Sequence, residues 1–185
     1  MVELARKKAT YQDLYSVPEN EMGEIIDGEL ITSPRPARPH IHAASALGIE
    51  VGPPYQFGRG GPGGWIIYYE PELQLEEHTM APDLAGWKRG RLLPLPTESR
   101  ITVAPDWVCE ILSPSTVRVD KVHKMPIYAQ YGVSHIWLVD PTARSLDVFR
   151  LDLGKWLLLE SFAENDKVRA EPFQEVEIDL GNLGL

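Results

Sequence analysis

The fold is decided by the stretch Pro105–Leu112, PDWVCEIL, a short apolar run with strand character. In an extended chain successive side chains point to opposite faces, so Trp107, Cys109 and Ile111 share one face. Glu110 points to the other face, between Val108 and Leu112, in the interior of an otherwise apolar strand. A carboxylate in that position is costly unless it is paired, protonated or bound to a metal. Glu110 is therefore the most informative residue of the chain.

The segments that follow predict a βαβ unit. Ser113-Pro114-Ser115-Thr116 opens a helical region that runs to Tyr131, Pro126 either kinks this region or begins its second half, and Gly132 ends it. The next strand, Ile136–Val139, stops at Asp140-Pro141. Two strands joined through a helix are expected to be parallel, with a right-handed crossover.

Outside this unit the sequence predicts a hairpin around Asp27-Gly28, a helix ended firmly by Gly52-Pro53-Pro54, and further strands. The Gly-rich residues 58–64 lack the Gly-Lys-Ser/Thr ending of a phosphate-binding loop and predict a surface turn. The expected helices are Thr10–Ser16 and His40–Val51; the expected strands are Trp65–Tyr69, Pro71–Glu77, Ala81–Trp87, the hairpin Ser145–Leu151 with Trp156–Phe162, and Val176–Leu180. The order predicts an α/β fold with a central mixed sheet flanked by helices.

Length and composition favour one domain over residues 1–185, with a lead-in at 1–20 and C-terminal strands in 145–185. The formal net charge of −9 counts against a broad basic surface for nucleic acid, although a nuclease also gathers acids at its metal site. A single cysteine excludes an intramolecular disulfide and suits a cytoplasmic protein. The N-terminus lacks the apolar region of a secretory signal, and no run approaches the roughly 20 apolar residues of a membrane span.

Asp83 is the natural partner of Glu110, because it follows Pro82 and opens the short strand that ends at Trp87. If the two strands are neighbours, their carboxylates converge, and a divalent cation such as Mg²⁺ relieves the repulsion between them. The alternatives stay open at this point. Glu110 could instead bond a helix N-terminus or pair with an arginine, and Asp83 could be a turn residue at a strand end.

Lys124 follows in the segment Asp120–Lys124, at the start of the helix that leaves the strand of Glu110. Its ammonium could reach back over the sheet edge and stabilise charge on a phosphate or orient an attacking water. The alternative is a solvated lysine, which is the usual fate of that residue.

These stretches together resemble the Uma2 family of restriction-endonuclease-like proteins. The resemblance covers most of the chain and rests on the order and spacing of several short motifs. They are Glu24–Leu30, Pro39-His40, Pro82-Asp83-Leu84, Pro105–Thr116, Asp120–Lys124, Tyr128–Val133 and Ile136–Pro141.

The resemblance implies the PD-(D/E)XK nuclease fold, in which Asp and Glu from adjacent strands bind Mg²⁺ or Mn²⁺ and a lysine assists. Pro82-Asp83 matches the PD half, and Glu110-Ile111-Leu112 matches the second half. Leu112 stands where that pattern has lysine, and Lys124 looks like the migrated replacement. Glu24 and His40 are candidates for additional members of the same pocket.

The expected function is DNA hydrolysis by Asp83, Glu110 and Lys124, with Lys88, Arg89 and Arg91 contacting backbone phosphates. Cutting both strands of a duplex would favour a homodimer. The rival hypothesis is a non-cutting module of the same fold that binds nucleic acid or protein. A zinc hydrolase using His40 or His123 is disfavoured because no His pair has HExxH spacing, and Cys109 has no adjacent base to act as a nucleophile.

Overall fold

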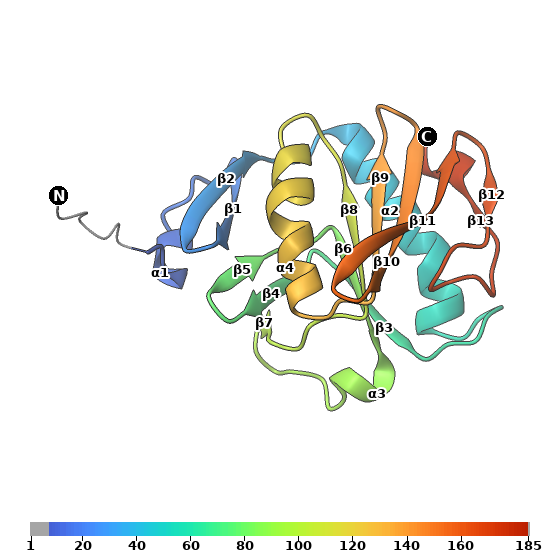
Figure 1. Ribbon diagram of the computed structural model, residues 1–185, viewed down its shortest axis with the longest axis horizontal. Coiled ribbons are helices and arrows are strands. Elements are labelled where there is room, and N and C mark those ends of the chain that lie inside the picture. Colours follow the sequence, from blue (N-terminus) through green and yellow to red (C-terminus); the bar gives the residue numbers. More distant parts are fainter. Residues whose placement is uncertain (1–7, 185) are drawn as a thin grey trace.

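The computed structural model describes residues 8–184, in which a six-stranded mixed sheet forms the centre of the fold (Figure 1). Its strand order is β11-β10-β9-β8-β6-β3. The strands are β3 (Trp65–Tyr69), β6 (Leu84–Lys88), β8 (Trp107–Ile111), β9 (His135–Asp140), β10 (Ser145–Asp152) and β11 (Lys155–Ala163). Strands β8 and β9 are parallel and the other pairs are antiparallel. The predicted mixed α/β architecture is confirmed, as is the parallel βαβ pair.

A second sheet of five strands, ordered β2-β1-β5-β4-β7, corrects the expectation of one central sheet. Its strands are β1 (Glu21–Ile26), β2 (Glu29–Pro34), β4 (Glu72–Leu75), β5 (His78–Met80) and β7 (Arg100–Ile101); a small third sheet pairs β12 (Lys167–Val168) with β13 (Ile178–Asp179). The hairpin of β1 and β2 turns at Asp27 and Gly28, both with positive φ, as the Asp-Gly dipeptide predicts. Strand β5 is too short, and follows β4 too closely, for its pattern to be recognised in the sequence.

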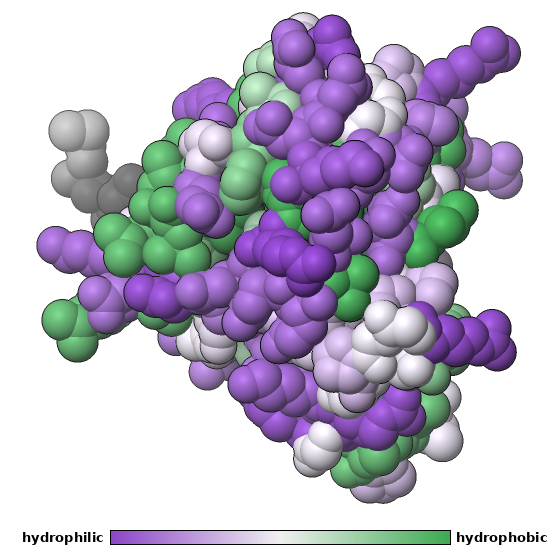
Figure 2. Space-filling model, turned by 90° about the vertical axis from the view of Figure 1, so that its right-hand side faces the viewer, coloured by the Kyte–Doolittle hydropathy of each residue, from purple (hydrophilic) through white to green (hydrophobic). Residues whose placement is uncertain are grey.

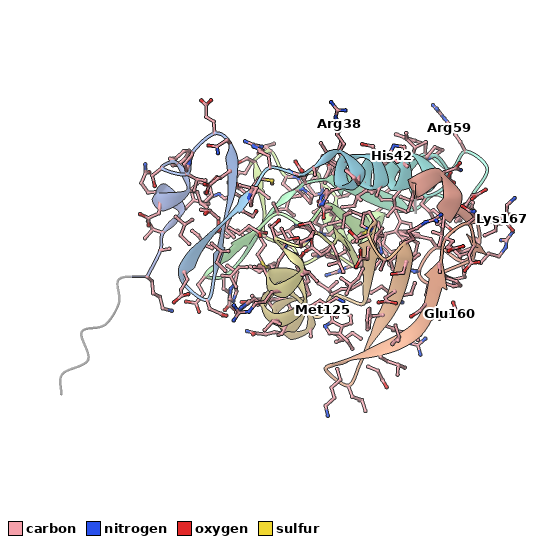
Figure 3. The ribbon with its side chains drawn as sticks, turned by 90° about the horizontal axis from the view of Figure 1, so that it is seen from above. Arg38, His42, Arg59, Met125, Glu160 and Lys167 are labelled. Atoms are coloured by element: carbon pink, nitrogen blue, oxygen red, sulfur yellow. The ribbon has the colours of Figure 1, made fainter. Side chains whose placement is uncertain are left out.

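Helices cover both faces of the six-stranded sheet. Seen from above in Figure 3, α2, which carries Arg38 and His42, lies on one side, and the helix that contains Met125 lies on the other. The helical segments are α1 (Tyr11–Leu14), α2 (Arg38–Val51), η1 (Gly52–Gln56), α3 (Arg89–Leu92), η2 (Val119–Lys124), α4 (Met125–Gln130) and η3 (Leu180–Leu183).

Side-chain alternation on β8 divides the core into two apolar layers. Trp107, Cys109 and Ile111 pack with residues of α2, whereas Val108 packs with residues of α4. Each large apolar side chain buried in this way contributes about 1.5–3 kcal/mol of transfer free energy. Glu110 points toward the α4 layer, so its carboxylate enters the region between the sheet and that helix.

Three local expectations were wrong. The chain does not leave helical geometry at Gly52, because a π turn continues through Pro53 and Pro54 to Gln56, with Phe57 N donating to Gly52 O. Residues 88–98, whose basic and proline-containing sequence predicts a loop, include the short helix α3. Residues Ser113–Thr116 form a turn before the helix rather than its first residues.

The Gly-rich segment is a surface turn as predicted, and it packs back on η1. A Cβ at Gly61 would lie 2.4 Å from Cβ of Pro54, so only glycine permits this close approach.

The face presented in Figure 2, the right-hand side of Figure 1, is mostly hydrophilic, with separate hydrophobic patches. Among the described residues, no helix is long and apolar enough to cross a membrane. The prediction about the first seven residues lies outside the part of the chain that the structure describes.

Candidate active site

Asp83 and Glu110 meet across two neighbouring strands. In the β6–β8 ladder Leu84 lies opposite Cys109, so one further step of the same register sets Asp83 opposite Glu110. Directly opposed residues of an antiparallel pair have Cβ atoms about 4.5–5.5 Å apart. The convergence expected from the sequence is therefore present, on two inner strands of the central sheet, where β6 begins and β8 ends.

Asp83 is held by a backbone amide and by a histidine. Its Oδ2 accepts a hydrogen bond from Ile111 N at 2.7 Å, and its Oδ1 lies 2.5 Å from Nε2 of His40. His40 occupies the first turn of α2 and is buried, whereas His42, two residues on, is exposed. The structure thus brings His40 into the candidate site through Asp83.

Glu110 is held from the opposite helix. Its Oε1 accepts a hydrogen bond from the Tyr128 hydroxyl at 2.7 Å and lies 2.9 Å from Nζ of Lys124. No arginine of residues 8–184 pairs with Glu110, so that alternative reading is wrong. Since both of its partners within this range bind Oε1, the second carboxylate oxygen is available to a further ligand.

Lys124 is a buried cation surrounded by carboxylates. Besides Glu110, its Nζ lies 3.1 Å from Glu24 Oε1 and 3.4 Å from Asp120 Oδ1. Glu24 reaches this position from β1 and is fixed there by Ala81 N, which donates to the same oxygen at 2.8 Å. Lys124 is therefore not the solvated lysine of the alternative interpretation, and Glu24 belongs to the same cluster.

The helix that carries Lys124 has a π turn at this point. Met125 N donates to Asp120 O, five residues back, immediately before Pro126. A proline ring clashes with the carbonyl four residues earlier in a regular helix, and the wider turn accommodates it. Pro126 thus lies in the first turn of α4 and begins the second half of the helical region, as predicted. Such π turns often occur at functional sites.

Two residues of the cluster were not singled out from the sequence as site residues. Asp120 and Tyr128 lie four residues before and after Lys124, on the same face of the helix. This i, i+4, i+8 spacing is the signal that predicts one cluster on this face of the helix.

The cluster carries more negative than positive charge. Three carboxylates (Glu24, Glu110 and Asp120) pair with the single ammonium of Lys124, and a fourth, Asp83, lies opposite Glu110. Burial raises the pKa of the Glu110 carboxyl well above its usual value, and the neighbouring carboxylates add to the rise although Lys124 opposes it. Burial alone would lower the pKa of Lys124, but the surrounding acids raise it well above its usual value, so the ammonium stays charged.

This donor set fits a hard divalent cation. Mg²⁺ keeps several waters and needs only one or two protein carboxylates, which Asp83 and Glu110 supply. Within residues 8–184 no three His, Cys, Asp or Glu side chains are arranged to hold a metal by themselves, as a closed structural site would require.

Lys88, Arg89 and Arg91 do not lie beside the carboxylates. Strand β6 runs from Leu84, next to Asp83, to Lys88, so about 16 Å of strand separates the two groups (Figure 1). The structure gives both arginines intramolecular partners. Arg89 donates to Gln56 O and Trp65 O, and Arg91 pairs with Asp106 at 2.8 Å. The contact of these three basic residues with nucleic acid stays a prediction. It concerns a surface that lies one strand length away from the carboxylates.

Comparison with known proteins points to one family. The sequence model of Uma2, described as "Putative restriction endonuclease", matches residues 9–181. The crystal structure of a "putative nuclease belonging to DUF820" from Anabaena variabilis ATCC 29413 has a TM-score of 0.70 and 24% sequence identity, covering 95% of this chain and 97% of that one. At that identity the likeness shows the fold alone. No curated protein matches the chain.

Proposed function

The chain belongs to the Uma2 family, as its sequence motifs predicted, and from this premise we propose that it is a metal-dependent endonuclease that hydrolyses phosphodiester bonds of DNA. The observation that supports the proposal is the opposition of Asp83 and Glu110 across β6 and β8, with the buried ammonium of Lys124 against Glu110. Carboxylate pairs with an adjacent lysine are suited to phosphoryl chemistry, in which charge develops on oxygen.

Asp83 and Glu110 would hold Mg²⁺ or Mn²⁺. A bound ion of this kind lowers the pKa of its water and neutralises charge on the phosphate. The remaining residues orient the acids: the amide of Ile111 and the ring of His40 fix Asp83, and Tyr128 fixes Glu110. Lys124 would place its positive charge beside the scissile phosphate or orient the attacking water.

The test is cleavage of labelled single-stranded and double-stranded DNA with Mg²⁺ or Mn²⁺, compared with EDTA. We expect Asp83→Asn and Glu110→Gln to lose at least a hundredfold in rate. Glu160→Gln, on the exposed strand β11, is the matched carboxylate control and should cleave as the wild type does (Figure 3). Equal activity in all four proteins would overturn the assignment.

A second candidate is a binding module that does not cut. The observation that favours it is that Lys124 is already paired with three carboxylates, a network that is stable in the absence of a phosphate. Binding of DNA without cleavage at any of the tested metals would support this module.

If the substrate is a duplex, the first proposal includes a homodimer, because two-fold symmetry would match two cuts. The mass of the protein in solution, measured by light scattering, tests it directly.

A further inference from the structure

The candidate site lies at the bottom of a small cavity. Its volume is about 300 Å³. Two short segments form its walls: residues 33–37, from the end of β2 to the start of α2, and residues 113–116, between β8 and the helix of Lys124. Glu110 and Lys124 are each 2% exposed and Asp120 is 4% exposed. The side chains of Asp83 and Glu24 are only 13% and 16% exposed. The acids therefore lie below the surface of the protein, not along an open groove.

The walls of the cavity are fixed by local interactions. Pro34 and Pro36 restrict one segment, and Arg35 between them donates from Nε to Glu19 O at 3.0 Å. In the other segment, Ser113 Oγ lies 2.9 Å from Ser115 Oγ and accepts from Thr116 N. The positions of the cavity walls are thus set by contacts within the folded chain.

A paired strand does not fit this geometry. A cavity of about 300 Å³ is at the lower end of the range for small-molecule sites, which bury most of their ligand. The phosphates of an intact duplex lie on a broad convex surface, and the opposite strand prevents either strand from entering so small a space. An unpaired nucleotide can rotate out of line and carry its phosphate to the cavity floor.

The charges around the cavity also favour an unpaired strand over a duplex. Proteins that hold duplex DNA neutralise several phosphates along its length. Among the described residues that line the cavity, Arg35 and Lys124 are the cations, and Lys124 is already paired with three carboxylates. Arg35, which is exposed at the wall, is the residue best suited to contact one phosphate.

From these observations we infer that the site takes an unpaired nucleic-acid strand, one nucleotide at a time, and excludes intact duplex. The inference rests on the proposed nuclease function and specifies the substrate for it. Because a single strand has no two-fold axis, it also removes the reason for expecting a homodimer.

The experiment compares four substrates in Mn²⁺: a labelled single strand, the same strand in a blunt duplex, the same duplex with an unpaired flap, and the small diester bis(4-nitrophenyl) phosphate. We expect the single strand to be cut at least tenfold faster than the duplex, and cuts in the flapped substrate to fall in the unpaired part. Duplex cleaved as fast as the single strand would overturn the inference and leave the nuclease function standing. If none of the four is hydrolysed with any divalent metal, the function fails and the inference with it.

Arg35→Gln provides a second measurement. Loss of one charge-assisted phosphate contact should raise the KM for the single strand about tenfold. Arg38→Gln is the matched control, because Arg38 is exposed on the outer side of α2 and does not line the cavity (Figure 3). An unchanged KM in Arg35→Gln, or an equal rise in both variants, would contradict the proposed path of the strand.

Discussion

Replacing Lys124 by methionine, which keeps most of the side-chain volume, should strongly destabilise the protein at neutral pH. The variant leaves three carboxylates, which now lie 2.9–3.4 Å from Nζ of Lys124, close together without their cation. At an effective dielectric constant of about 20, each such contact is worth about 4 kcal/mol of Coulomb energy, much of which is offset by the cost of burial. Removal of one partner from a buried ion pair usually costs about 3–5 kcal/mol, and we expect a loss in this range.

The loss should depend on pH. The pKa of Glu110 is already raised by burial, and without Lys124 it should rise further. A carboxyl whose folded pKa is raised contributes most to stability below its unfolded value and loses that contribution as pH rises through the folded pKa. Destabilisation by Lys124→Met should therefore be largest near pH 8 and shrink toward pH 5, where the acids take up protons.

Urea unfolding followed by tryptophan fluorescence at pH 5 and pH 8 measures this difference. Lys121→Met is the matched control, since Lys121 is exposed on the same helix, and its effect should stay within about 0.5 kcal/mol. If Lys124→Met is as stable as the wild type at pH 8, Lys124 is not the counterion of the buried acids.

Other changes test separate parts of the structure. Tyr128→Phe removes the hydroxyl that donates to Glu110 and should lower the free energy of unfolding by about 1–3 kcal/mol, because a buried acceptor loses its partner; an unchanged urea midpoint would contradict that contact. Gly61→Ala would set a Cβ against Pro54 and should cost about 1–3 kcal/mol in the same assay, whereas a neutral effect would mean that the turn moves freely. Cys109 is fully buried and its thiol pKa is raised by burial, so it should resist a disulfide reagent at pH 8 until urea unfolds the protein, and rapid labelling of the native protein would refute this.

Part of the site could be predicted because single residues contradicted their local pattern. Glu110 was recognisable as a charge inside an apolar strand, and side-chain alternation correctly placed it on the other face of the strand from Cys109. The structure adds that α4 covers that face. The proximity of Asp83 to Glu110 follows from the prediction that the strands now seen as β6 and β8 are neighbours. These inferences depend only on the alternation of side chains along a strand and on the free-energy cost of burying a charge.

The rest depended on contacts between distant segments. Glu24 joins the cluster because β1 pairs with β5, which brings it to Ala81, and no local pattern of β1 indicates that pairing. The second sheet was missed for the same reason, since its strands are short and β4 pairs in parallel with β7, far along the chain. The π turns were missed because a proline in a helical pattern predicts an end or a kink of the helix and does not indicate a wider turn.

The balance of charge distinguishes this cluster from an ordinary structural ion pair. A buried ion pair is tolerated when opposite charges are matched and each hydrogen-bonding group is satisfied. Here acids from β1, β8 and the π turn meet one ammonium, and Asp83, the residue before β6, lies opposite Glu110, so the fold gathers more acidic than basic side chains. Such an arrangement is costly for stability alone, and a divalent cation at Asp83 and Glu110 would offset it. The same cation would attract a phosphate into the cavity. It would offset the excess of acidic side chains, which otherwise repels an anion, at the place where the scissile bond must lie.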